Sequence, residues 1–569
     1  MSDTPMLAIT IANAQAAKGP AQEPFPPRDG CAVVPLIEAA AMFPALERLA
    51  LAAKSHVWLA FRIFDPDTPL YSDEAKALGL ADWGALFAHV AERGVEVRLM
   101  LADFEPVMAD YLHAKSWGSF NRLRALQKES GGRVQVLVVQ HVGEIGVAWR
   151  QMLRLPLRGK TRKVVEKLLG EGPAAFTDRP GLWRNIGWED GRPVRWKAAG
   201  PPRLWPATFH HKFAVFDGET AVIGGIDVNE RRYDDQDHDQ RADRTWHDIS
   251  SQVTGPVVAD AAAHFTRLWN TESARATEIA GYWSEGAPEA LALGELSELA
   301  VPTAAVPPTA GDATVQLLRT RSRRNASPFA FGPHAHVREL RAAHRLIFEA
   351  ARERLYIEAQ FFRSKLAAQW LADALRSNPA LEVIILVANV PEEVAFEGQG
   401  SNPAHRHGEY LQARALKRVV KAGGIDRVGL FSLARDARAQ GKERVFAKDR
   451  GTAYGAGLIH IHAKLVIADD RAALLSSANI NGRSFEWDSE LGILWQPSGE
   501  AIRRFRAELW RQLSDDALDE TAGVAEWRAL ALNNATNDPE RRRGFIIPYQ
   551  IGRARRFGRP AWFVPDDLV

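Results

Sequence analysis

Two stretches of the sequence decide the fold: FHHKFAVFDGETAVIGGIDVNER at residues 209–231 and IHAKLVIADDRAALLSSANINGR at residues 461–483. They align without gaps at a constant offset of 252 residues (209 to 461). Each stretch predicts a strand, a tight turn, a second strand and a polar loop. The shared polar residues are His210 and His462, Lys212 and Lys464, Asp217 and Asp469, Asn229 and Asn481, and Arg231 and Arg483. The chain therefore contains an internal duplication.

The segments around the duplicated stretches predict an α/β fold. In the first half, a strand at 57–63, a helix at 83–92 and a strand at 95–101 follow one another. In the second half, a helix at 337–352 leads to strands at 355–358 and 383–387. This alternation predicts two pseudo-symmetric lobes, each with a mixed β-sheet flanked by helices. The duplication places the expected active site at the lobe interface.

The division of the chain follows from its composition. The Pro- and Ala-rich stretch VPTAAVPPTAGD has the composition of a linker. We expect a flexible N-terminus at 1–30, a first lobe at 31–300, the linker at 301–312, a second lobe at 313–520 and a basic C-terminal tail at 521–569.

Composition excludes several classes of protein. The 569 residues are 46% hydrophobic and 25% charged, which is typical of soluble globular domains. The net charge of +2 provides no general attraction to nucleic acid, so no nucleic-acid partner is expected. A single cysteine, Cys31, rules out an internal disulfide and a cysteine zinc site. We expect neither a cleaved signal peptide nor a transmembrane helix, and a location in the cytoplasm or peripherally at a membrane surface.

The repeated H-x-K pattern indicates phosphoryl-transfer chemistry. His and Lys two apart on a strand lie on the same face. Imidazole suits nucleophilic attack or proton transfer near neutral pH, and Lys and Asn donate hydrogen bonds to phosphoryl oxygens. Two alternatives are weaker: a pair of buried core histidines, and a two-histidine metal site. Asp217 and Asp469 lie seven residues on, beside the turns, so the metal site has no carboxylates at ligand spacing. The site is expected to need neither a metal nor a cofactor.

Both stretches match H-x-K-x4-D and so resemble the phospholipase D superfamily. The second continues into SSANINGRS (476–484) and DSE (488–490), and the first is followed by WHDIS (246–250). YIEAQFF (356–362) and FDPDTPL (64–70) also resemble segments of that family. Some positions differ between the copies: Asp227 stands opposite Asn479, and Gly224–Gly225 opposite Ser476–Ser477. Ala359 replaces the asparagine usual in the Y-I-E segment.

The resemblance implies a two-step phosphodiester exchange through a covalent phosphohistidine. It implies His210 as the nucleophile and His462 as the general acid and base, although the two copies themselves do not distinguish these roles. Lys212, Lys464, Asn229 and Asn481 are then expected to bind the phosphate oxygens. A histidine in such a role needs an acceptor for its other ring nitrogen, and we assign Asp248 to His210 and Glu490 to His462. We interpret Asp217 and Asp469, the remaining members of the motif, as structural turn residues.

The implied substrate is a glycerophospholipid such as phosphatidylcholine, met at a membrane surface by a monomer. The alternatives are a cardiolipin synthase-like phosphatidyltransferase and a nuclease-type phosphodiesterase of the same superfamily. A catalytically inactive lipid-binding scaffold would require a broken motif, and neither copy is broken. Basic and apolar residues alternate at 154–169 and again beyond Arg541, which fits a contact with anionic lipid headgroups or simply solvated helix faces.

Overall fold

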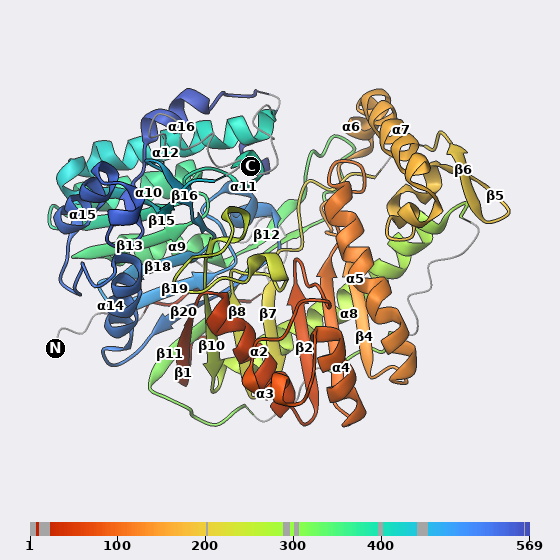
Figure 1. Cartoon of the computed structure of the whole chain (residues 1–569), viewed down its shortest axis with the longest axis horizontal. Coiled ribbons are helices and arrows are strands. Elements are labelled where there is room, and N and C mark those ends of the chain that lie inside the picture. Colours follow the sequence, from red (N-terminus) through yellow and green to blue (C-terminus); the bar gives the residue numbers. More distant parts are fainter. Residues whose placement is uncertain are drawn as a thin grey trace.

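The computed structural model describes residues 7–10, 23–200, 203–287, 296–300, 306–395, 402–440, 453–562 and 564–569. Within these residues, a mixed sheet of 17 strands forms the centre of the molecule, accompanied by two small two-stranded sheets. Helices flank the large sheet, so the expected α/β class is confirmed (Figure 1).

The first half contributes seven strands in the order β4-β3-β2-β7-β8-β10-β1. β2, β3 and β4 are parallel to one another, and the other neighbours are antiparallel. The strands are β1 (Arg28–Ile37), β2 (His56–Phe61), β3 (Glu96–Ala102), β4 (Val134–Val139), β7 (Lys212–Phe216), β8 (Thr220–Gly224) and β10 (Ile249–Thr254). The helices between and after them are α2 (Ala39–Ala52), α3 (Asp73–Ala77), α4 (Trp83–Glu92), α5 (Asp110–Glu129) and α8 (Val257–Ser284).

The second half repeats this order as β15-β14-β13-β18-β19-β20-β11. Its strands are β11 (Ala313–Arg323), β13 (Arg354–Ala359), β14 (Glu382–Val387), β15 (Val428–Arg438), β18 (Lys464–Ala468), β19 (Ala472–Ser476) and β20 (Glu490–Gln496), with β12 (His334–Arg338) beside the end of β11. The helices are α9 (Glu339–Ala350), α10 (Lys365–Ser377), α11 (Glu392–Ala395), α12 (Pro403–Arg427) and α14 (Ala501–Ser514). The duplication therefore extends over 14 of the 17 strands of the sheet, seven in each half.

The two sets of strands are joined, whereas the sequence predicts a separate sheet in each half. β1 pairs with β10 along most of its length, and its first residues also pair with β11 at Arg28↔Val315 and Cys31↔Ala313. The exposed edges of two sheets present unpaired backbone groups, and pairing satisfies them. The halves thus form one continuous sheet.

The duplicated stretches form the centre of each half. All residues of β7 and β18 are buried, as expected of central strands with both faces covered. Each strand ends in a tight turn whose residues have positive φ: 53° at Asp217 and 69° at Gly218, and 52° at Asp469 and 56° at Asp470. Such backbone angles are typical of short hairpin turns and favour Asp and Gly. These turns return the chain antiparallel into β8 and β19.

An insertion distinguishes the first half. Between β4 and β7 lie α6 (Val147–Met152), α7 (Arg154–Glu171), β5 (Ile186–Glu189) and β6 (Arg192–Trp196). Figure 1 shows these elements together at one end of the molecule, beyond α5. No helix in the described residues is both long enough and apolar enough to cross a bilayer.

The predicted flexible N-terminus and the predicted linker are each described only in part, and the described part of the N-terminus is bound to the second half. Within the predicted flexible N-terminus, residues 7–10 and 23–30 are described, and Leu7 and Ile9 donate backbone hydrogen bonds to Gln496 and Gln316. The predicted linker is described only from residue 306 onward, and residues 1–6, 11–22 and 301–305 lie outside the described residues.

The predicted C-terminal tail belongs to the second half. It forms α15 (Val524–Thr536), β21 (Ile546–Pro548) and α16 (Ile551–Phe557), and β21 pairs with β15. Trp527, Ile546 and Ile547 are fully buried. The prediction of a basic tail rested on the arginines of this segment. The segment nevertheless folds against the second half, because burial of these apolar side chains stabilises it.

Candidate active site

Each predicted histidine lies just before a central strand, at a point where the two halves pair with each other. The segment entering β7 pairs with the second half, and the His210 N–H donates to the Ser489 carbonyl at 2.9 Å. The segment entering β18 contains β17 (His460–Ile461), which pairs in parallel with β9 (Trp246–His247) of the first half. The His462 N–H donates to the His247 carbonyl at 2.8 Å. Two reciprocal contacts therefore hold the histidines in place.

The carboxylates are exchanged between the halves, and this corrects the predicted pairing. Nδ1 of His210 lies 2.8 Å from Oε2 of Glu490, and Nδ1 of His462 lies 2.5 Å from Oδ2 of Asp248. The prediction paired each histidine with the other acid. The backbone pairing explains why the prediction was wrong. The segment that pairs beside His210 ends at Ser489, just before Glu490, and the segment that pairs beside His462 ends at His247, just before Asp248. Each Nδ1 is thus occupied, which leaves Nε2 of each ring for chemistry.

The differences between the two copies fit their different acids. An added Cβ at Gly225 would lie 2.3 Å from Oδ1 of Asp248, so this glycine makes room for the carboxylate. The equivalent residue, Ser477, instead donates its hydroxyl to Oε2 of Glu490 at 2.5 Å. Gly225 and Ser477 are therefore each adapted to the acid that they contact.

A cavity of about 230 Å³ opens onto both histidines. His210 and His462 line it, as does Asn481 of the predicted phosphate-binding set. Lys212, Lys464 and Asn229 are buried and are not part of this lining. The remaining lining residues are Arg62, Arg232, Gln360, Phe361, Arg363, Glu392, Ala404, His405, Asn479, Arg483, Ser484, Asp488, Leu568 and Val569.

The two lysines are held close to the histidines. Nζ of Lys212 donates to the His210 carbonyl at 3.3 Å and lies 3.9 Å from Oδ1 of Asp227. Nζ of Lys464 donates to the His462 carbonyl and lies 3.5 Å from Oε1 of Gln360. Burial lowers the pKa of Lys212 to about 8, and burial also lowers the pKa of Lys464. Both ammonium groups are therefore poorly compensated charges in a buried site.

The same environment favours neutral histidines. Burial lowers the pKa of His210 well below its ordinary value, and the positive charge of Lys212 lowers it further. Burial and the charge of Lys464 lower the pKa of His462 in the same way. A neutral imidazole whose Nδ1–H donates to a carboxylate presents an Nε2 lone pair, which is the nucleophilic form.

The two buried carboxyl groups can hold the proton that the leaving group needs. Burial raises the pKa of Asp248 to about 6 and also raises that of Glu490. Each histidine–carboxyl pair can therefore hold one shared proton near neutral pH. The arrangement supplies both a nucleophile and a proton donor.

The motif aspartates lie at the opposite end of the strands, where they bind backbone. The Asp217 carboxylate accepts hydrogen bonds from the N–H groups of residues 54, 55 and 56 at 2.8–2.9 Å. The Asp469 carboxylate accepts from those of residues 352, 353 and 354 at 2.7–2.8 Å. Each aspartate thus fixes its turn to the start of the neighbouring strand, β2 or β13.

Asp217→Ala and Asp469→Ala are expected to affect stability rather than chemistry. Each change leaves three backbone donors without their carboxylate, and we expect a loss of about 2 kcal/mol in the free energy of unfolding. Denaturant unfolding measures this loss, and kcat of the folded fraction should stay within about threefold of wild type. A large fall in kcat with unchanged stability would contradict the structural role.

Four arginines of the cavity were missed by the sequence reasoning: Arg62, Arg232, Arg363 and Arg483. They come from four separate segments, so no local pattern links them. Arg483 alone carried a signal, since it is one of the duplicated polar residues, and it pairs with Asp488 at 3.0 Å. The guanidinium of Arg232 lies 4.4 Å from the Trp246 ring centroid. These charges favour an anionic substrate.

One cluster of possible metal ligands occurs in the described residues: Glu38, His238 and His247. Nδ1 of His247 lies 2.5 Å from Glu38, and Nε2 lies 2.8 Å from Glu358. Burial opposes a charge on His247, but the two carboxylates outweigh it and raise its pKa well above its ordinary value. The other Glu38 oxygen accepts the Asp248 N–H at 3.1 Å. The cluster therefore satisfies itself as an ion-paired network that positions Asp248.

The sequence of the chain is similar to those of proteins named phospholipase D. The chain is 28% identical over 278 residues to phospholipase D1 of Homo sapiens, covering 44% of this chain and 24% of the human protein. It is 23% identical over 403 residues to phospholipase D alpha 1 of Oryza sativa subsp. japonica, covering 53% of this chain and 48% of the rice protein. The chain therefore matches less than half the length of these curated relatives. No family profile matches it.

Among solved structures, a phosphatidylserine synthase of Haemophilus influenzae aligns over 86% of this chain and 87% of its own, with 16% identity and a TM-score of 0.48. The duplicated H-x-K-x4-D motif and the relatives named phospholipase D identify the chain as a member of the phospholipase D superfamily.

Proposed function

We propose that the protein is a phospholipase D-type phosphodiesterase that hydrolyses a glycerophospholipid, phosphatidylcholine or a similar lipid, to phosphatidic acid and the headgroup alcohol. The observation that carries this proposal is the pair of histidines in one cavity, each with Nδ1 on a buried carboxylate from the other half. Two such rings supply a nucleophile and an acid on either side of one phosphorus.

In the first step, Nε2 of His210 attacks phosphorus and forms a P–N bond. The bond between phosphorus and the headgroup oxygen breaks, and that oxygen takes the proton held by the His462–Asp248 pair. In the second step, water attacks phosphorus and gives its proton back to His462. The P–N bond then breaks, which releases phosphatidic acid and restores neutral His210. The assignment of His210 as nucleophile rests on the resemblance, because the two histidine environments are nearly equivalent.

Charge develops on the non-bridging oxygens in both steps. Lys212 and Lys464 lie close enough to lower the pKa of both histidines, and they are well placed to stabilise this charge. Asn481 lines the cavity, so its amide can donate to the phosphate. Asn229 is buried outside the lining, and we propose a role for it only as support for the loop after β8.

Product analysis with a competing alcohol tests the proposal. Once the headgroup alcohol has left, a primary alcohol such as 1-butanol can use the same path in reverse. Phosphatidylcholine with 1-butanol should give phosphatidylbutanol beside phosphatidic acid. Parallel reactions with phosphatidylglycerol and single-stranded DNA test the alternatives, a cardiolipin synthase-like phosphatidyltransferase and a nuclease-type phosphodiesterase. Cleavage of DNA alone would overturn the phospholipid assignment.

The pH profile should fall on the alkaline side. Each lysine is charged below its pKa, and burial lowers the pKa of Lys212 to about 8 and that of Lys464 to about 7, so both lose their charge well below pH 10.5. We expect kcat/KM to begin to fall above about pH 7 and to fall by about tenfold or more per pH unit above about pH 8, since kcat/KM reports the free enzyme. The measurement is kcat/KM from pH 6 to 10, and a constant value to pH 10 would contradict the role of Lys212.

A further inference from the structure

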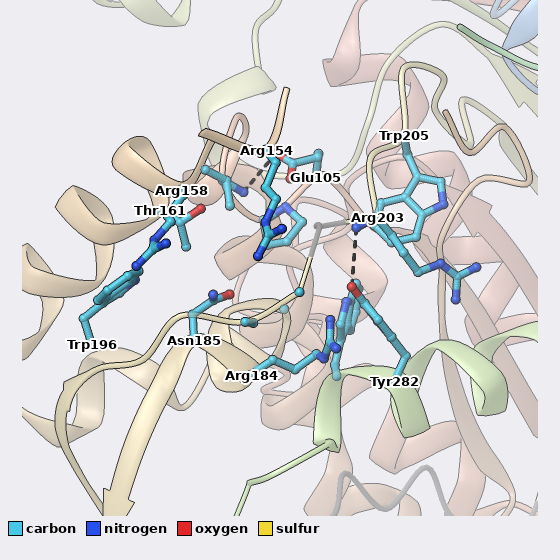
Figure 2. A pocket seen from close by; sticks show the side chains of 16 residues that line it. Glu105, Arg154, Arg158, Thr161, Arg184, Asn185, Trp196, Arg203, Trp205 and Tyr282 are labelled. Atoms are coloured by element: carbon cyan, nitrogen blue, oxygen red, sulfur yellow. Dashed lines mark hydrogen bonds between the residues drawn. The ribbon is translucent and has the colours of Figure 1, made fainter. Parts of the chain in front are cut away.

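A second cavity lies under the insertion of the first half, in the region of α7, β6 and α8 (Figure 2). Four arginines line it: Arg154, Arg158, Arg184 and Arg203. It shares no lining residue with the cavity at the two histidines. Its volume is about 40 Å³, which suits a small charged group rather than a whole lipid.

Two of these arginines have no acidic partner within the described part of the chain. Arg154 and Arg158 are exposed at the rim, and neither forms an ion pair with any residue that the structure describes. The guanidinium of Arg158 lies 5.1 Å from the Trp196 ring centroid, which orients the charge without neutralising it. Figure 2 shows Arg154 and Arg184 reaching toward the cavity from opposite sides.

The other two arginines lie deeper, and both have acidic partners. Arg184 pairs with Glu285 at 2.8 Å, and Arg203 pairs with Glu144 at 2.9 Å and with Glu278 at 3.0 Å. Both guanidinium groups stack on the ring of Tyr282, at 4.1 and 5.2 Å from its centroid. Because a guanidinium has five N–H donors, each arginine keeps donors for a ligand.

A buried acid completes the lining. Glu105 is 8% exposed, and its Oε1 has no hydrogen-bond partner among the described residues. Its Oε2 accepts from the backbone N–H groups of Val107 and Met108. Burial raises the pKa of this carboxyl to about 7, so a large share of it is protonated at neutral pH. A protonated carboxyl donates a hydrogen bond to an oxyanion instead of repelling it.

The surface around these elements is apolar as well as basic. Large apolar side chains are exposed at the start of α5 and on α6 and α7, among them Met108, Tyr111, Met152 and Leu155, which are 60–75% exposed. Leu155 directly follows Arg154 in the chain. Exposed apolar residues beside arginines are typical of segments that meet an anionic lipid surface.

We propose that this cavity binds the phosphate group of an anionic ligand, either the phosphomonoester headgroup of a phospholipid or a free phosphate ester. Arg154 and Arg158 bind the phosphate at the rim, Arg184 donates from below, and Glu105 donates to a remaining oxygen. The site is separate from the catalytic cavity, so it does not depend on the proposed function. No covalent step is involved.

The test uses protein carrying His462→Ala throughout, so that no lipid is turned over during the measurement. One arm is flotation with vesicles of phosphatidylcholine, with and without about 20% phosphatidic acid, at physiological salt. The other arm is calorimetric titration with glycerol 3-phosphate. The test variant is Arg154→Ala with Arg158→Ala. The matched control is Lys163→Ala with Lys167→Ala, which removes the same charge from α7 at exposed positions outside the cavity.

We expect the arginine variant to weaken binding about tenfold or more in at least one arm, and the lysine control to change it less than about threefold. Loss in the titration indicates a free phosphate ester, and loss confined to the vesicles indicates a lipid headgroup. Equal losses in the two variants would show diffuse surface charge and would overturn the proposal. Absence of binding in both arms would overturn it as well.

Discussion

Alanine in place of either His210 or His462 is expected to lower turnover about 10³-fold or more. The two rings line one cavity and act on one phosphorus, so neither half can work alone. Each ring is buried and its Nδ1 is bound to a buried carboxylate, so we also expect the melting temperature to fall by a few degrees, and turnover is referred to the folded fraction. Steady-state turnover of phosphatidylcholine and a thermal melt measure the two effects.

The matched control is His334→Ala, which removes an exposed imidazole on β12. It should leave both turnover and unfolding unchanged. If His210→Ala or His462→Ala kept more than about a tenth of the wild-type rate, a barrier change below about 1.4 kcal/mol, a shared site would be excluded.

The second large effect concerns the exchanged carboxylates. Asp248→Asn removes the negative charge that faces Nδ1 of His462, which protonates the leaving group, whereas Glu490→Gln removes the negative charge that faces Nδ1 of His210, the proposed nucleophile. A p-nitrophenyl leaving group needs little protonation. With a p-nitrophenyl phosphodiester, Asp248→Asn should therefore still release a rapid burst of p-nitrophenol, followed by slow turnover. Glu490→Gln should slow the burst itself about 10²-fold or more.

Stopped-flow measurement of the burst separates the two variants. The pairing predicted from the sequence would reverse the pattern, with the fast burst in Glu490→Gln. That reversed result would show either that His462 is the nucleophile or that the carboxylates are not exchanged. Burst kinetics of His462→Ala resolve this ambiguity, because a fast burst there requires His210 as the nucleophile.

Local features of the fold could be predicted from the sequence. The helix expected at 83–92 is α4 (Trp83–Glu92), because Asp82 caps its first turn and Gly94, with φ of 91°, stops the chain just beyond its end. The helix expected at 337–352 begins two residues later, because β12 extends to Arg338. The duplicated motif likewise indicated both histidines and both lysines, but the histidines precede strands β7 and β18, and only the histidines line the cavity.

Features that depend on contacts between distant segments could not be predicted. Asp248 and Glu490 each follow the motif of their own half, and the prediction assigned each acid to the histidine of that half, which is the wrong partner. The reciprocal backbone pairs at Ser489 and His247 decide the exchange, and these exist only in the folded chain. The cavity arginines come from separate segments for the same reason. Within the described residues, the insertion with its second cavity has no counterpart in the second half, so the duplication carried no information about it.

The proposed mechanism passes through a covalent phosphohistidine formed between the two halves, and the configuration at phosphorus reports whether this intermediate forms. A substrate made chiral at phosphorus with oxygen isotopes or sulfur is converted to a phosphatidyl alcohol, and the configuration of the product is determined. Attack by His210 inverts phosphorus, and attack by the alcohol on the intermediate inverts it again. We therefore expect net retention. Net inversion would mean that the alcohol displaces the headgroup in a single step, and it would contradict the covalent intermediate.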